Sequence, residues 1–278
     1  MVVLDCCELF SEKMKLETMS DQLEVPTMAE FMAAGKEPEI LYWVGSAGSY
    51  DDRAKKITKA FVRILNRANV DFAVLGSEES NTGDVAKRAG NEFLFQMQAM
   101  MNIEVLNGYG IKRIVTCDPH SFNCIKNEYP GLGGNFDVVH HTQYIKELIS
   151  EGRLNLEGNT YKGKRITFHD PCYLGRANNE YDAPRDVLRK TNANLIEMKR
   201  HKATALCCGA GGAQMFKEPE KGNMDINILR TQDALETKPD IIATGCPYCN
   251  TMMTDGVKFN EKEDKISVMD IAELIANT

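Results

Sequence analysis

The chain has 278 residues, of which 43% are hydrophobic and 26% charged, a composition typical of a soluble globular protein with room for two domains. A formal net charge of -7, five histidines and one tryptophan argue against nucleic-acid binding and against a histidine-rich metal site. No run of about 18 apolar residues is present, and Asp5 and Glu8 come too early for a secretory signal. We therefore expect a cytoplasmic protein with no direct membrane insertion, although a partner could attach it to a membrane complex.

The first half of the chain alternates between predicted strands and helices. Residues 1–36 are expected to form an N-terminal arm, in which Thr27 and Glu30 make the capping box of a short helix ending near Gly35. Apolar runs and helical periodicity then alternate through a first lobe at 37–155. Its predicted elements are strands at 39–45, 71–76 and 111–116, helices at 51–70 and 87–110, and a strand running into a helix over 136–152.

The second half, residues 156–278, repeats this order. Its predicted elements are strands at 164–171, 192–199, 239–245 and 266–270 and helices at 182–191, 224–238 and 271–278. Strands that alternate with helices indicate parallel sheets with crossover helices. The predicted fold class is therefore α/β, with two similar Rossmann-like parallel-sheet lobes facing each other.

The spacing of particular residues supports an internal duplication. Cys172 and Cys207 are separated by the same number of residues as Ser46 and Asn81. The local contexts also agree, since CCG at 207–209 corresponds to NTG at 81–83 and CPYCNT at 246–251 corresponds to DPHSFN at 118–123. We infer two homologous halves, joined near the polar, glycine-containing stretch 152–163.

Three segments carry the cysteines of the second half: HDPCYLGR at 169–176, LCCGAGG at 206–212 and GCPYCN at 245–250. Each lies at the end of a predicted strand, and the carboxyl ends of strands in open α/β sheets are where sites assemble. In a reducing cytosol, clustered cysteines indicate metal or redox chemistry more often than disulfides. The five cysteines in question are Cys172, Cys207, Cys208, Cys246 and Cys249.

The number of cysteines favours an iron–sulfur cluster over a single zinc ion. Zinc takes four ligands, usually from two paired motifs, and this half has only one CxxC. Iron–sulfur clusters are held by cysteine thiolates and fit the count better. Structural zinc, and buried or catalytic free thiols, remain as alternatives on chemistry alone.

The pattern Cys172 … Cys207-Cys208-Gly … Cys246-Pro-x-Cys249 resembles the cysteine-rich CCG domain of the B- and D-type subunits of heterodisulfide reductase. The same domain occurs in glycolate-oxidase and lactate-utilisation iron–sulfur subunits, and the resemblance covers roughly residues 38–278. It implies that the five cysteines hold one [4Fe-4S] cluster, cubane or noncubane, in the C-terminal lobe.

The family's reaction is the cleavage or formation of a disulfide in two one-electron steps. The resemblance therefore implies an oxidoreductase subunit that works with a small disulfide or thiol substrate and a ferredoxin-like iron–sulfur or flavoprotein partner. Two other functions stay open: a non-catalytic electron-relay or assembly subunit, and a zinc-bound structural module.

The first lobe departs from the family pattern. The positions that would carry cysteines hold Ser46, Asn81, Asp118 and Ser121. Serine and asparagine are poor ligands for iron in sulfide clusters, and a single aspartate cannot hold one. We therefore expect no cluster in this lobe, although a rebuilt site using Cys117, Cys124, Asp118 or His120 is an alternative.

Residues beside the cysteines are candidates for catalysis. His169 and Asp170 precede Cys172 and could give a proton to a leaving thiolate, or Asp170 could merely shape the turn. Arg176 could neutralise cluster charge, hold a substrate carboxylate or pair with a surface acid. His140 and His141 could line a site in the first lobe or bind substrate, or they could serve at a turn or helix start. Cys6 and Cys7 are expected to be incidental thiols of the arm.

Overall fold

The computed structural model describes residue 23 and residues 25–156, 158–218 and 221–278. Most of the expected arm, including Cys6 and Cys7, lies outside these residues. Within them, no helix is both long enough and apolar enough to cross a bilayer.

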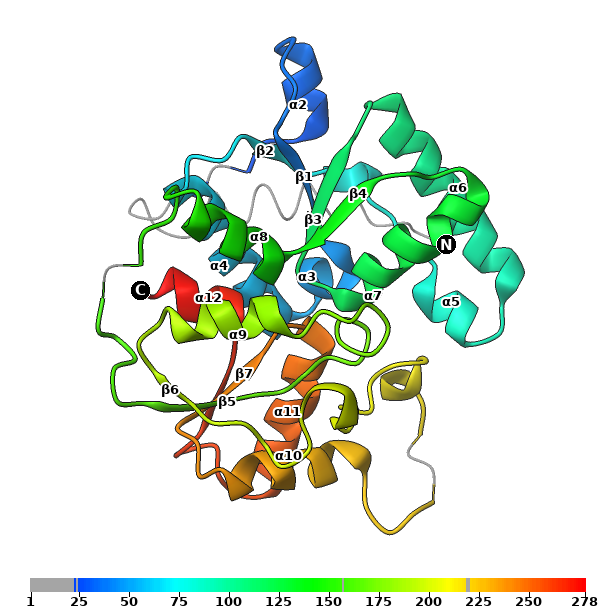
Figure 1. Cartoon of the computed structure of the whole chain (residues 1–278). Helices are drawn as coiled ribbons and strands as arrows, with labels where there is room; N and C mark the ends of the chain where they lie inside the picture. The colour runs from blue at the N-terminus through cyan, green and yellow to red at the C-terminus, as the bar shows by residue number, and fades with distance from the viewer. Residues whose placement is uncertain (1–22, 24, 157, 219–220) are drawn as a thin grey trace.

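Two four-stranded parallel sheets form the centre of the molecule (Figure 1). The first sheet has the order β2-β1-β3-β4, and the second has the order β6-β5-β7-β8. The strands of the first sheet are β1 (Ile40–Trp43), β2 (Phe72–Ala73), β3 (Arg113–Thr116) and β4 (Asp137–His140). The strands of the second sheet are β5 (Arg165–Phe168), β6 (Asn194–Leu195), β7 (Ile241–Thr244) and β8 (Ser267–Asp270).

The two sheets confirm the predicted α/β fold with two similar lobes. Leu41 of β1 pairs with Ile114 of β3, and Ile166 of β5 pairs with Ile241 of β7, so the central pairings of the two lobes correspond. Gly83 and Gly209 also match, because both have a positive φ, +88° and +91°, which favours glycine.

Helices connect the strands in both lobes. Those of the first lobe and the segment before it are α2 (Met28–Ala33), α3 (Gly45–Tyr50), α4 (Asp52–Arg67), α5 (Asp84–Arg88), α6 (Glu92–Gly108), α7 (Pro119–Asn123) and α8 (His141–Ser150). Those of the second lobe are α9 (Asp182–Arg189), α10 (Ile226–Glu236), α11 (Pro247–Phe259) and α12 (Ile271–Ala276). Thr27 and Glu30 form the expected capping box of α2.

One long predicted helix is two helices in the structure. The prediction at 87–110 was wrong because Gly90, with a φ of +86°, ends the helical path of α5. Asn91 then caps α6 by accepting a hydrogen bond from Leu94 N at 3.1 Å. The strand expected at 192–199 is also much shorter, since only Asn194 and Leu195 pair with β5.

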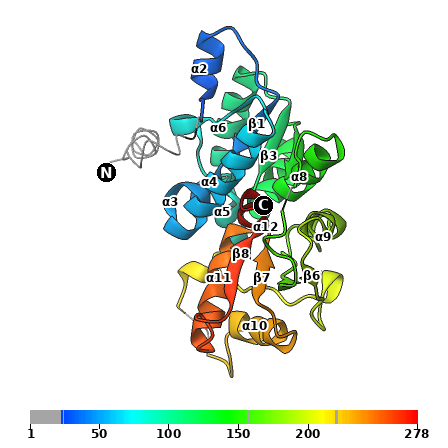
Figure 2. The ribbon, with the colours of Figure 1, turned by 90° about the vertical axis from the view of Figure 1, so that its left-hand side faces the viewer.

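One of the hydrophobic cores formed by the described residues spans both lobes. It contains Phe61 of α4, Phe168 of β5 and Leu274 of α12, all almost fully buried. Helices α4 and α12 pack against each other between the two sheets (Figure 2). The lobes are therefore joined by shared apolar packing, and the domain boundaries at 36 and 155 stay predictions.

Two buried histidines add polar links between the lobes. His140 Nε2 donates to Gly245 O at 3.0 Å, and His140 also bonds Thr142. His141 Nε2 lies 3.0 Å from the Asp270 carboxylate at the start of α12. Burial, and then the neighbouring His141, holds the pKa of His140 well below its usual value, so this ring is neutral. These contacts give both histidines structural roles at the helix start and between the lobes.

The His141–Asp270 pair makes stability depend on pH. Burial lowers the pKa of His141, but the Cys117 sulfur and the Asp270 carboxylate outweigh it and raise the pKa from 6.5 to about 10. Because the folded pKa exceeds the unfolded one, the stabilisation is fully present below pH 6.5 and is lost as pH rises through about 10. We expect the free energy of unfolding, from urea titrations, to fall across this window. The free energy of unfolding should fall less in Asp270→Asn, whose amide can still cap α12. Equal falls in the wild type and in this variant would contradict the role given to the His141–Asp270 pair.

Candidate metal centre

The five cysteines of the second lobe meet at the carboxyl end of its sheet. Cys172 follows β5, Cys207 and Cys208 lie in the loop before α10, and Cys246 and Cys249 lie at the junction of β7 and α11. The Sγ atoms of Cys172 and Cys207 are 3.8 Å apart, and those of Cys208 and Cys249 are 3.3 Å apart. Cys208, Cys246 and Cys249 are buried together in one cluster, with Cys207 packed against it.

Local geometry holds these sulfurs in place. Pro247 begins α11 directly after the N-cap residue Cys246, which fixes the turn that carries both α11 cysteines. Gly209 N donates to the Cys207 sulfur at 3.3 Å. A Cβ at Gly209 would clash with Ile226 of α10, and the residue also has a φ of +91°, so only glycine suits this position.

The cysteine cluster cannot ionise fully without a positive centre. Hydrogen bonding to neighbouring sulfurs, and then burial, raises the pKa of Cys172, Cys208 and Cys249. Bonds from Cys172 and Cys208 lower the pKa of Cys207, which accepts from both sulfurs. Several thiolates at this place therefore require a cation or cationic cluster to neutralise them.

His169 lies at the wall of the cysteine cluster. It is fully buried, and a ring nitrogen lies within 4.8 Å of the sulfurs of Cys208 and Cys249. Burial, followed by the charge of Arg230, lowers the pKa of His169 to about 3. The ring is therefore neutral near pH 7, which favours a hydrogen-bonding role over the proton donation that the sequence predicts.

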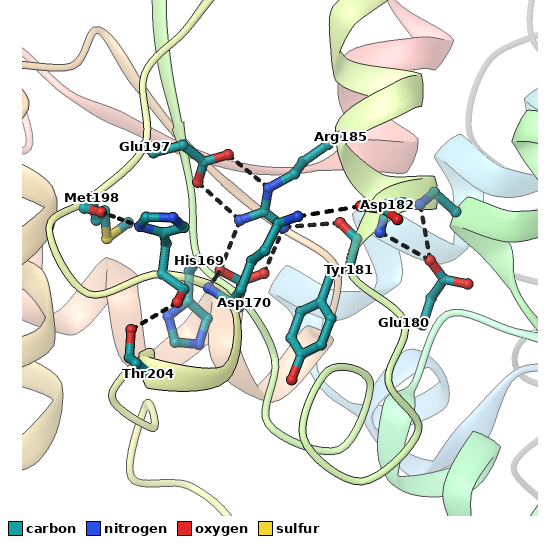
Figure 3. Close-up of polar contacts among 12 residues, drawn as sticks. His169, Asp170, Glu180, Tyr181, Asp182, Arg185, Glu197, Met198 and Thr204 are labelled. Atoms are coloured by element: carbon teal, nitrogen blue, oxygen red, sulfur yellow. Dashed lines mark hydrogen bonds and ion pairs between the residues drawn. The ribbon is translucent and has the colours of Figure 1, made fainter.

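Asp170 is held in an ion-pair network that Figure 3 shows beside His169. Its oxygens accept from Arg185 at 2.7 and 3.0 Å and from Lys202 N at 2.7 Å. Arg185 also binds Glu197 through Nε and Nη2, at 2.6 and 2.8 Å. Both oxygens of Asp170 are thus occupied, which favours a structural role, and its predicted catalytic role stays a prediction.

Arg176 connects two cysteine-bearing loops. The residue is exposed, and its Nη1 donates to Ala205 O at 3.1 Å. Ala205 lies in the loop that leads to Cys207. This contact ties the Cys172 loop to the Cys207 loop. Its predicted role in neutralising cluster charge or holding a substrate carboxylate also stays a prediction.

The four positions of the first lobe that correspond to cysteines also come together. Asn81 Nδ2 donates to Ser46 Oγ at 3.0 Å, and Ser121 Oγ donates to Asp118 Oδ2 at 2.7 Å. All four line one cavity, which the 210–216 loop of the second lobe faces. The four positions therefore lie together as the cysteines of the second lobe do, but their polar side chains pair with one another.

Cys117 and Cys124 do not join this cavity. Cys117 is buried in the core shared by the lobes and accepts from Tyr42 OH at 3.6 Å. Cys124 is buried in a separate core, where its thiol donates to Thr82 O at 3.4 Å. A rebuilt first-lobe site using both thiols does not agree with these positions.

His120 of the first lobe lies against the cysteine-bearing loops of the second. Its ring stacks on Tyr173, with 4.4 Å between centroids, and meets Tyr248 edge-on at 5.3 Å. Its Nδ1 lies 2.9 Å from Asp84 Oδ2. Burial lowers the pKa of His120, but the bond to Asp84 and the charge of Asp118 raise it to about 9. The ring is therefore an imidazolium at neutral pH.

A cleft runs between the lobes beside the cysteines. One cavity of about 270 Å³ is lined by residues that include Tyr50, Met215, Phe216 and Tyr248. It adjoins the cavity that holds His120, because Ser46, Met215, Phe216 and Tyr248 line both. The cleft thus has an aromatic and thioether wall and a polar end.

A family model for the cysteine-rich domain CCG matches residues 40–126 and 166–254. The chain belongs to the CCG family. The two matches fall one in each lobe, which agrees with the duplicated sheets and confirms the family that the cysteine pattern indicates.

Curated proteins similar to this chain are longer than it is. A Bacillus subtilis protein named "Probable iron-sulfur-binding oxidoreductase FadF" is 48% identical over 92% of this chain and 36% of its own length. An "EtfAB:quinone oxidoreductase" of Syntrophomonas wolfei is 44% identical over 87% of this chain and 34% of its own length. The D-type polypeptide of the dihydromethanophenazine:CoB–CoM heterodisulfide reductase of Methanosarcina barkeri is 34% identical, over 86% of this chain and 58% of its own length. The chain spans about a third of the length of the first two.

Two residues beside the cysteine cluster were not predicted from the sequence. Arg185 and Arg230 are fully buried on α9 and α10, where they bind Asp170 and His169. The available signal was an arginine on the apolar face of a predicted helix, since Leu188 lies three residues after Arg185. Such an arginine needs a buried partner, but the pattern does not say which.

Proposed function

We propose that this chain is an iron–sulfur redox subunit that holds one [4Fe-4S] cluster in its second lobe and exchanges electrons with a small disulfide or thiol. The observation that carries the proposal is the meeting of sulfurs from three separate loops. The five sulfurs that would hold the cluster belong to Cys172, Cys207, Cys208, Cys246 and Cys249. The cluster is placed in the second lobe alone, because the equivalent first-lobe side chains bear oxygen and nitrogen and pair with one another.

The donor set fits an iron–sulfur cluster better than a single ion. Five sulfurs exceed the four ligands of tetrahedral zinc, and all of them are soft donors. When bound, an iron–sulfur cluster supplies single electrons.

The cleft beside the cysteines is the proposed substrate site. Tyr248 and Met215 line it and also pack on the cysteine cluster, so a molecule bound there would lie beside the cysteine-bearing loops. Disulfide reduction breaks one S–S bond and needs two electrons and two protons. The electrons would come, one at a time, from a one-electron donor protein of the ferredoxin or flavoprotein class.

His120 is proposed to hold a proton for this reaction. Its Nδ1 proton is bonded to Asp84, so the proton available to a leaving thiolate is the one on Nε2. The ring lines the cleft and lies against Tyr173 and Tyr248. At neutral pH it also places a positive charge near developing thiolate charge.

The partner is proposed from relatives that are longer than this chain. The chain spans only 36% of the FadF protein and 34% of the EtfAB:quinone oxidoreductase. We propose that an electron-donor protein or domain supplies the remaining functions, and that any attachment to a membrane complex comes through it. The cytoplasmic location is part of this proposal.

Anaerobic purification followed by iron, sulfide and zinc analysis tests the cluster. We expect about four irons and about four sulfides per chain, with absorbance near 400 nm that bleaches on reduction. About eight irons would contradict the assignment of a single cluster, and one colourless zinc would replace it with a structural module. Turnover of small disulfides with a reduced one-electron donor would support the enzyme, and a loaded protein without turnover would be a relay.

A further inference from the structure

His169 offers a buried hydrogen-bond donor to the cysteine cluster. The residue follows β5, and its main-chain N–H donates to Ala243 O at 2.9 Å, which fixes the base of the side chain. A ring nitrogen lies within 4.8 Å of the sulfurs of Cys208 and Cys249. The ring has no exposed surface.

Arg230 decides which ring nitrogen carries the proton. Its Nε donates to His169 Nδ1 at 3.0 Å. A guanidinium has only donors, so Nδ1 must be the acceptor and the neutral ring must carry its proton on Nε2. Arg230 is itself fixed, because it is fully buried and its Nη1 donates to Arg200 O at 2.7 Å and to Asp233 Oδ2 at 3.3 Å.

The Nε2 proton lacks an acceptor among the residues that the structure describes. A buried donor without a partner is destabilising, so such a donor points to a group that occupies the site. The candidate acceptors in reach are sulfurs, since the neighbouring side chains are Cys208 and Cys249. The same arrangement argues against His169 as an iron ligand. Ligation through Nε2 would require the ring to lose its second proton while Nδ1 still accepts from Arg230.

We propose that His169 donates a hydrogen bond from Nε2 to a sulfur of the bound cluster, and that Arg230 is the positioning residue that keeps the proton on Nε2. This inference rests on the proposed iron–sulfur function. A hydrogen bond to cluster sulfur withdraws electron density and makes reduction easier. His169 therefore raises the reduction potential, and Arg230 acts on the cluster through the ring.

The test compares loaded wild-type protein with His169→Leu, His169→Gln and Arg230→Gln. In the wild type we expect the Fe–S stretching bands in resonance Raman spectra to shift in D₂O, and pulsed paramagnetic resonance to detect one weakly coupled nitrogen. In His169→Leu both signals should disappear and the potential, from a spectroscopically monitored titration, should become more negative. His169→Gln keeps an amide donor and should restore part of the D₂O shift of the Fe–S bands. Arg230→Gln should weaken the D₂O shift although His169 is intact.

Several outcomes would overturn the inference. A strongly coupled nitrogen in the wild type would show that His169 is a ligand. An unchanged reduction potential in a fully loaded His169→Leu would show that His169 does not influence the cluster. His201→Leu is the matched control, because its ring bonds Met198 O and it lies outside the cysteine cluster. If the histidine variants do not fold, the D₂O shift and nitrogen coupling of the wild type decide the question. A wild type without iron and sulfide would instead refute the proposed function itself.

Discussion

Replacing Cys249 by serine should abolish most of the iron bound by the protein. Cys249 is buried at the start of α11, and its sulfur lies 3.3 Å from that of Cys208. A serine oxygen at this position is a harder and less acidic donor than a thiolate, so it is a poor ligand for iron in a sulfide cluster. We expect iron and sulfide per chain, measured after anaerobic reconstitution, to fall roughly tenfold, with parallel loss of the visible absorbance.

The matched control is Cys124→Ser. Cys124 is equally buried, but it lies in the apolar core of the first lobe, where its thiol donates to Thr82 O. A serine hydroxyl can keep that bond, and we expect wild-type iron content. The pair of variants also locates the cluster. Full iron in Cys249→Ser together with loss in Cys124→Ser would move it to the first lobe and refute the proposed site.

Replacing Arg185 by methionine should destabilise the fold by about 3–5 kcal/mol, the usual cost of removing one partner from a buried ion pair. The Arg185 side chain is 1% exposed and lies between Asp170 and Glu197, with four N–O distances of 2.6 to 3.0 Å (Figure 3). Methionine preserves the apolar stem but leaves the Asp170 carboxylate buried without its counterion. Urea unfolding monitored by circular dichroism measures the effect.

Arg189→Met provides the comparison on the same helix. The Arg189 side chain is 62% exposed and pairs with Asp186 at 3.0 Å on the surface. Such pairs contribute about 0–1 kcal/mol, so this variant should unfold nearly as the wild type does. If both variants lost the same small amount, the network around Asp170 would not stabilise the loop that leads to Cys172.

Much of the site could be predicted because it depends on local order along the chain. Strands that alternate with helices form parallel sheets, and the carboxyl ends of such strands meet at one edge. Residues placed directly after strands, as Cys172 and Cys246 are, must therefore lie near one another once the sheet forms. The matching spacing of Ser46 and Asn81 likewise predicted a first half homologous to the second, and these two side chains do meet.

Helix boundaries were less predictable, because a single residue can override the periodicity around it. The helix predicted over 87–110 includes Gly90 and Asn91, but Gly90 adopts a positive φ and Asn91 caps the next helix. A flexible glycine gives no local signal of which conformation it takes. In the folded chain, Asn91 N donates to Ala86 O at 2.8 Å across this glycine and so closes the end of α5.

By itself the sequence determined the duplicated α/β fold, the family and the five sulfurs, since residue type and spacing along strands carry that information. Only the tertiary structure decided that Arg230 orients His169, that Arg185 neutralises Asp170 and that His120 reaches across to the second lobe. These contacts join residues that are far apart in sequence or lie on different elements. They arise when the two lobes and their helices pack together, and charged side chains enclosed by that packing take whichever partners the shared interior places within reach.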